Sequence, residues 1–280
     1  MRDHKKIFYL FQAGSFSLLL AVAYQHLFWD APYRALLWDR EMMEGLVNWA
    51  TKMSWEDYVT NLEMDACISN VIKMMGGFYL IAAVASLWVK RFYQFVKPLL
   101  IIASISLFFL ALLYAKESFS NPFQFFEHSL QWTSPLFLIW LVKSKTISAR
   151  FVFFVKLAIA LTFLAHGLYA LNVFPRPGLF MEMTMNITGM EEKGTVHLLN
   201  TVGCLDLISS VGIFLPTKWA RWFLYYIIFW GFWTTMARVW AFTDTQNLLS
   251  GLHEWGYETL IRFPHFLIPI ALLLFLSDDR

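Results

Sequence analysis

The sequence has few charged residues and few cysteines. Charged side chains make up 15% of the 280 residues, whereas 58% are hydrophobic and 19% are aromatic. Because an ordinary soluble domain carries about 25% charged residues, this composition excludes a typical soluble globular fold. The 2 cysteines exclude a disulfide framework and a redox pair of closely spaced cysteines. Cys204 lies within a long apolar stretch, which is typical of a small buried apolar residue.

The motifs that mark several common enzyme classes are also missing. The sequence contains no phosphate-binding loop, dinucleotide-binding fingerprint, zinc-protease motif or nucleophile motif. A hydrolase or an ATPase therefore has no support in the sequence. The net charge is only +2, and the basic residues form no patch that would bind nucleic acid.

Long apolar stretches make up most of the chain. A helix needs about 20 apolar residues to cross the hydrocarbon core of a bilayer, and about eight stretches reach that length. They are residues 7–29, 69–89, 98–115, 124–142, 151–173, 197–215, 219–242 and 260–277. Glu127 and His128 interrupt the fourth stretch, and Pro264 and Pro269 interrupt the eighth. We expect an all-α integral membrane protein with about eight transmembrane helices; six helices with two re-entrant segments are the alternative.

Lysine and arginine cluster in alternate loops. They precede the first stretch and lie between the second and third, the fourth and fifth, and the sixth and seventh: Arg2, Lys5, Lys6, Lys90, Arg91, Lys97, Lys143, Lys145, Arg150, Lys218 and Arg221. Because cytoplasmic loops carry the excess of these residues, both termini are predicted to be cytoplasmic. The long loops 30–68 and 174–196 are then extracytoplasmic. We expect a multi-pass protein of the cell membrane, of the bacterial inner-membrane type.

The two halves of the sequence resemble each other. "WVKRFYQFVKPLL" at 88–100 and "PTKWARWFLYYII" at 216–228 occupy equivalent places, and so do the segments 23–45 and 164–189. Each half consists of a helix with a late histidine, a long outer loop that opens on proline, and three further helices. The sequence therefore predicts two parallel four-helix repeats, 1–148 and 149–280, related by an axis along the membrane normal.

The second half also resembles a known family. "HG" at 166–167, followed by "VGCLDLISSVGIFLPTKWARWFLYYI" at 202–227, is similar to the DoxX-like superfamily of four-helix membrane proteins. The matching features are Asp206, Gly212, Lys218 and Arg221, whereas Phe78 stands in the first half where Asp206 stands in the second. The family includes a subunit of thiosulfate:quinone oxidoreductase. The resemblance therefore implies redox-linked work.

Histidine is concentrated on the predicted outer side. Every histidine except His4 falls in an outer loop or near the outer end of a stretch. His26 and His166 occupy corresponding helices of the two halves, and His128 lies in the fourth stretch. Facing imidazoles can hold a metal or a haem, or can hydrogen-bond a quinone head group; the alternative is buried histidines bonded to nearby hydroxyls or carbonyls. The others on this side are interpreted as interfacial anchors: His197, His253 and His265.

Charged residues inside the apolar stretches are candidate functional groups. Asp206 lies near the middle of the sixth stretch, where a carboxylate costs several kcal/mol unless it is protonated or paired. Arg238, in the seventh stretch, is its expected partner, in a pair that is either structural or functional. Glu127 beside His128 is suited to proton relay or to support of a ligand.

Methionine shares the outer side with histidine. Met181, Met183 and Met185 alternate with polar residues in the second long loop. In an extended segment they would point to one side, and thioethers are ligands that Cu(I) prefers. A helix that packs on the bilayer is the alternative. We also expect the segment 179–190 to cover an outward-open cavity lined by His166 together with His26 or His128.

Three classes of function agree with the sequence. The first is an outward-facing protein that binds a quinone, haem or copper and works with a redox partner in a redox-linked process. If this protein is an enzyme, it is expected to be a quinone-linked membrane oxidoreductase. The second is a non-enzymatic accessory or assembly subunit of a larger membrane complex. The third is a transporter of a metal or a small acid, with which parallel repeats and intramembrane charges also agree.

Overall fold

The computed structural model describes residues 2–144 and 146–278; Lys145 lies outside them. The described residues form helices and no strand. The helices are α1 (Arg2–Phe28), α2 (Arg34–Leu37), α3 (Arg40–Thr51), α4 (Trp55–Thr60), α5 (Leu62–Leu87), α6 (Tyr93–Glu117), α7 (Pro122–Glu127), α8 (Ser129–Lys143), α9 (Ala149–Ala170), α10 (Gly178–Thr188), α11 (Glu192–Gly212), α12 (Thr217–Phe242), the 3₁₀ turn η1 (Thr245–Asn247), α13 (Leu248–Ile261) and α14 (Pro264–Asp278).

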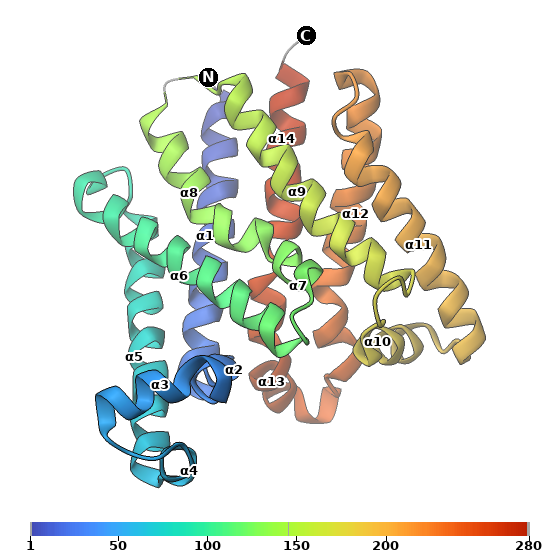
Figure 1. The fold of residues 1–280 in the computed structure, drawn as a ribbon. Helices are drawn as coiled ribbons and strands as arrows, with labels where there is room; N and C mark the ends of the chain where they lie inside the picture. The colour runs from blue at the N-terminus through green and yellow to red at the C-terminus, as the bar shows by residue number, and fades with distance from the viewer. Residues whose placement is uncertain (1, 145, 279–280) are drawn as a thin grey trace.

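The long helices lie side by side and connect two ends of the molecule (Figure 1). The two chain termini lie at one end, and the short helices α2, α3, α4 and α10 lie at the other. The two long loops of the sequence therefore share one end of the molecule.

Among the described residues, five helical segments are long and apolar enough to cross a membrane. They are residues 4–28, 62–87, 93–117, 149–170 and 248–277. This composition indicates a membrane protein in contact with a lipid bilayer. The helices α11 and α12 have 21 and 26 residues but are less hydrophobic, and α8 has 15.

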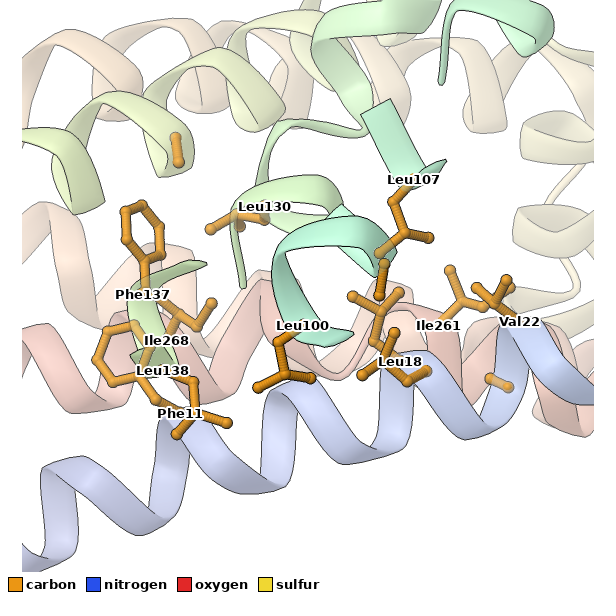
Figure 2. Close-up of a cluster of buried hydrophobic side chains, with 14 of the residues drawn as sticks. Phe11, Leu18, Val22, Leu100, Leu107, Leu130, Phe137, Leu138, Ile261 and Ile268 are labelled. Carbon is orange, nitrogen blue, oxygen red and sulfur yellow. The ribbon is translucent and has the colours of Figure 1, made fainter. Parts of the chain in front are cut away.

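The first helix forms the centre of the hydrophobic core. Helix α1 packs against α5, α8, α13 and α14. Figure 2 shows Phe11 and Leu18 of α1 beside Leu100 of α6, Leu138 of α8 and Ile268 of α14. Side chains from both halves of the chain thus share one core, which fixes the second half against the first.

Two helical segments are broken where the sequence has its interruptions. Between α7 and α8, the Nδ1 atom of His128 is 2.6 Å from the carbonyl oxygen of Gln124. The side chain therefore hydrogen-bonds a backbone carbonyl group near the break. Between α13 and α14, Pro264 lacks an N–H and disfavours a helical residue before it. The carbonyl oxygen of Arg262 accepts from the backbone N–H of His265 over 2.9 Å and from the hydroxyl of Thr235 over 3.2 Å, which ties the break to α12.

The short helix α3 is fixed at its first residue. The carboxylate of Asp39 accepts from the backbone N–H of Met42 over 3.0 Å and from Lys116 at the end of α6. The Lys116 ammonium lowers the pKa of Asp39 below its usual value. Val47 is buried, whereas Trp49 on another side of α3 is 73% exposed. One side of the helix therefore packs on the protein and another apolar side is free.

Candidate functional site

A pocket of about 360 Å³ lies in the second half, between α9, α10, α11 and α12. Its walls are mainly apolar and aromatic. The apolar lining is Phe163, Ala170, Phe180, Met183, Ile187, Leu198, Leu199, Val202, Phe229, Trp230, Trp233, Ala237 and Trp240. The polar lining is His166, Thr184, Thr188, Asp206, Thr234, Arg238, Arg262 and His265. Pockets that bind small molecules combine such walls with a few converging polar groups.

Helix α10 covers one end of the pocket. The chain leaves α9 through Asn172, which has a positive φ of 60°. Arg176 then donates from Nε to the carbonyl oxygen of Ala170 over 3.0 Å and from Nη2 to the side chain of Asn200 over 2.7 Å. These bonds hold the loop against α9 and α11. Residues of the predicted lid segment 179–190 line the pocket together with His166, but its walls are mainly apolar, whereas the expected cavity was polar and open to the outside.

Two histidines lie together at the polar part of the pocket. The ring centroids of His166 and His265 are 5.6 Å apart. A Cβ atom at Gly231 would lie 2.8 Å from the carbonyl oxygen of His265, so glycine allows α12 to approach the start of α14 this closely. His265 is 2% exposed, and its Nε2 atom has no hydrogen-bond partner among the described residues. Such an atom costs about 1–3 kcal/mol when it is left unpaired.

Ion pairs lie next to these histidines. The Nε atom of Arg238 is 2.5 Å from Oε2 of Glu258, and Nη1 of Arg262 is 3.2 Å from the same oxygen. The Oε1 atom of Glu127 is 3.9 Å from Nδ1 of His166, which is beyond hydrogen-bond reach. Two arginines and two glutamates therefore surround the histidines. We call His166, Arg238, Arg262 and His265 the polar end of the pocket.

The expected pair of Asp206 with Arg238 is wrong. Asp206 is 2% exposed, and its Oδ1 atom accepts a hydrogen bond of 2.8 Å from the hydroxyl of Tyr226. Tyr226 and Arg238 are separated by about 18 Å along α12 at 1.5 Å per residue. Asp206 lies at the level of Tyr226, and Arg238 pairs with Glu258 instead.

His26 lies in a separate environment, so the expectation that it faces His166 is wrong. It is fully buried, with Nδ1 2.7 Å from the carbonyl oxygen of Val22 and Nε2 3.1 Å from the hydroxyl of Tyr33. Burial raises the pKa of Tyr33 to about 12, so this hydroxyl stays neutral. Both nitrogens of His26 are satisfied within the first half, as in the alternative given above.

His128 is also occupied by protein groups. Its ring stacks on Tyr114, with centroids 4.9 Å apart, and its Nδ1 atom bonds the backbone at the break of α7 and α8. It does not line the pocket, so His166 has neither of its two expected companions there. The neighbouring Glu127 is 9% exposed and turns toward His166.

The methionines do not form a thioether site. Met181, Met183 and Met185 lie in the helix α10, where residues two positions apart point about 200° apart. The sulfur of Met181 accepts from Arg176 over 3.6 Å, Met183 lines the pocket, and Met185 is 37% exposed. In the part of the chain that the structure describes, no three His, Cys, Asp or Glu residues gather as metal ligands. The extended geometry assumed for copper is therefore wrong.

Three residues of the site were not recognised from the sequence. His265 was interpreted as an interfacial anchor, and Glu258 and Arg262 were not singled out. The signal that could have found them is Pro264, because a proline at a helix break gathers the ends of two helices. Cys204, expected to be buried, is exposed, because an apolar residue of a membrane helix can equally face lipid.

Comparisons with known protein families, curated proteins and solved structures give no match. The pocket and its chemistry are the features of the molecule that indicate a function.

Proposed function

We propose that this chain is an integral membrane protein of two parallel four-helix repeats whose second half binds a quinone-like amphipathic molecule in a redox-linked process. The element order supports the repeat. In each half a long helix is followed by short loop helices, two long helices and one broken helix. With α8, α11 and α12 in the bilayer beside the five apolar segments, the count becomes about eight.

The observation that carries this proposal is the unpaired Nε2 atom of His265 beside a pocket with aromatic walls. A flat ring can stack on Trp230 and Phe180, and a carbonyl or hydroxyl on that ring supplies the missing hydrogen bond. His166 is 21% exposed in its side chain and provides a second polar contact. A quinone head group combines these features in one molecule.

The charges of the site favour a neutral head group. Arg238 and Arg262 carry two positive charges, and Glu127 and Glu258 carry two negative charges. Because the two glutamates together balance the charge of the two arginines, an anionic head group would gain little. A neutral quinone adds no buried charge.

Quinone reduction requires two protons and two electrons. In this proposal His166 relays protons from water to the quinone oxygens, and the carboxylate of Glu127, 3.9 Å from Nδ1 of His166, stabilises the imidazole while it carries a proton. The electrons come from a redox partner in this proposal.

A transporter is the second candidate. The broken pairs α7 and α8, and α13 and α14, support it, because discontinuous helices often form the substrate sites of transporters. The break at Arg262 lies at the pocket. A transporter would move its substrate across sealed vesicles, whereas a quinone site would not.

Binding of decylubiquinone, a quinone with a ten-carbon tail, tests the proposal. The protein is purified in mild detergent, and quenching of tryptophan fluorescence is titrated, since Trp230, Trp233 and Trp240 line the pocket. We expect His265→Leu and His166→Leu each to weaken binding by about tenfold, equivalent to about 1.4 kcal/mol. The matched control is His197→Leu, because His197 is exposed and lies outside the pocket.

Equal affinity in all three variants, with their folds intact, would contradict the proposal. No binding at all would favour the accessory role. An optical spectrum and a metal analysis of the same sample complete the test: a Soret band or stoichiometric copper would assign haem or copper in place of quinone.

A further inference from the structure

The exposed part of the pocket lining follows one side of α12. Phe229, Trp233 and Trp240 line the pocket and are 62%, 38% and 55% exposed. Their spacing of four and seven residues places them on one stripe of the helix. The stripe is about 16 Å long at 1.5 Å per residue. The pocket is therefore open along α12 and not only at its covered end.

The other side of this opening is α11. Leu198 and Val202 of α11 line the pocket, while α10 covers one end and α9 contributes Phe163 and His166 to the back wall. Figure 1 shows α11 at the edge of the bundle next to α12, with α9 crossing in front of α12 in that view. The opening thus lies between α11 and α12, and α9 forms its back wall.

The outer side of α11 is also apolar at several positions. Leu205, Ile208 and Val211, which do not line the pocket, are 40%, 56% and 69% exposed. Helix α12, with 26 residues, is about 39 Å long and packs along α14, which belongs to the apolar segment 248–277. A surface of this kind beside a spanning segment contacts hydrocarbon rather than water.

The polar end lies away from the exposed stripe of α12. His166 comes from α9, and Arg262 and His265 come from the break between α13 and α14. Arg238 belongs to α12 itself, but it is only 7% exposed and so does not share the exposed stripe. A volume of about 360 Å³ lies at the lower end of the range for pockets that bind small molecules, about 300–1,000 Å³. That is room for a substituted ring but not for a long chain attached to it.

We infer that the pocket opens sideways into the bilayer between α11 and α12, and that its ligand is a membrane-resident molecule whose apolar tail occupies this opening. The identity of the head group rests on the proposed quinone function; the sideways opening rests on the exposed stripe of α12. The head group then lies at the polar end of the pocket and the tail lies in the opening. The ligand reaches the site from the bilayer without passing through water.

A fluorescent label in the opening tests this inference. In a Cys67→Ser, Cys204→Ser background, Trp233→Cys is labelled with bimane and the protein is placed in lipid nanodiscs. We expect 12-doxyl phosphatidylcholine to quench the label and aqueous iodide not to do so. The matched control is Ile208→Cys, because Ile208 is exposed on α11 and lies outside the pocket lining.

Decylubiquinone distinguishes an opening that a tail occupies from a bare surface. We expect it to lower lipid quenching at position 233 by at least about half, since a pocket of this kind buries most of its ligand, and to leave position 208 unchanged. The tail-less head group, 2,3-dimethoxy-5-methylbenzoquinone, should lower it much less.

Three results would overturn the inference. Iodide quenching at 233 without lipid quenching would show that the opening faces water. Equal effects of the two quinones would show that the tail lies elsewhere. If decylubiquinone does not change the lipid quenching at position 233, its tail does not occupy the opening. The tryptophan fluorescence titration then shows whether the protein binds quinone at all.

Discussion

Replacement of Gly167 by alanine tests how closely α9 and α11 pack behind the pocket. A Cβ atom at Gly167 would lie 2.9 Å from the carbonyl oxygen of Gly203, and a Cβ atom at Gly203 would lie 3.0 Å from the carbonyl oxygen of Gly167. Both obstacles are backbone atoms, which cannot rotate away as a side chain can. Small residues of this kind let membrane helices approach each other closely. Gly167→Ala therefore forces the two helices apart.

Two opposing effects set the magnitude. Overpacking of a close contact costs about 1–3 kcal/mol, whereas alanine in place of glycine within a helix contributes about 0.5–1 kcal/mol of stability. We expect a net loss of about 1–2 kcal/mol. The Cβ atom of Asp206 would lie 3.1 Å from the new methyl group, so the pocket wall moves as well and quinone affinity falls.

Gly77→Ala is the matched control. Gly77 lies in α5, and a Cβ atom there would meet no atom within 4 Å, so this variant should gain about 0.5–1 kcal/mol. The free energy of unfolding is measured by titration with sodium dodecyl sulfate in mixed micelles, followed by loss of helical circular dichroism. If Gly167→Ala raises the free energy of unfolding as much as Gly77→Ala does, α9 and α11 are not in close backbone contact at Gly167 and Gly203.

Three further predictions concern the charged residues. Glu258→Gln should lower the free energy of unfolding by about 3 kcal/mol, which is the lower end for a broken buried pair because Glu258 is 26% exposed. Adding Arg238→Met should recover part of this loss in the same micelle titration. If nothing is recovered, Glu258 and Arg238 are not coupled. Tyr226→Phe removes the hydrogen bond to the buried carboxyl group of Asp206 and should lower the free energy of unfolding by about 1–3 kcal/mol. Asp206→Asn keeps an acceptor for the Tyr226 hydroxyl and should lower it less. The reverse order would contradict the hydrogen bond between Tyr226 and Asp206. The pKa of Asp39 is lowered by the lysine at the end of α6, so its stabilising effect is present above the usual carboxyl pKa and is lost as the pH falls through the lowered value. The protection of the α3 amides, measured as the ratio of intrinsic to observed hydrogen-exchange rate, should therefore fall in acid, and Asp39→Asn should abolish that pH dependence.

Features that depend on local sequence could be predicted. The composition indicated membrane helices, and the interruptions at His128 and Pro264 marked the two places where helices break. Proline acts on its own helix, and its effect needs no knowledge of distant residues. The position of α10 over His166 was predicted for the same reason: two prolines after α9 end the helix and leave a short loop.

Features that depend on which helices face each other could not be predicted. The hydropathy of α12 indicated the depth of Arg238 but not the side of the helix on which it points. Its partner was therefore predicted to be Asp206, whereas Arg238 pairs with Glu258. Likewise, the alternation of methionines was interpreted as an extended segment, whereas Met181, Met183 and Met185 lie in a helix. A period of two residues in a short polar loop does not distinguish these structures.

The two histidines that the proposed repeat makes equivalent differ in what fills the space beside them. In the first half, Tyr33 from the segment 30–68 lies 3.1 Å from the imidazole of His26, whose ring is fully buried. In the second half, the segment 174–196 forms α10, and His166 lines a pocket together with residues of that helix. The helix position that the proposed repeat makes equivalent is thus filled by a tyrosine side chain in one half and faces a pocket in the other.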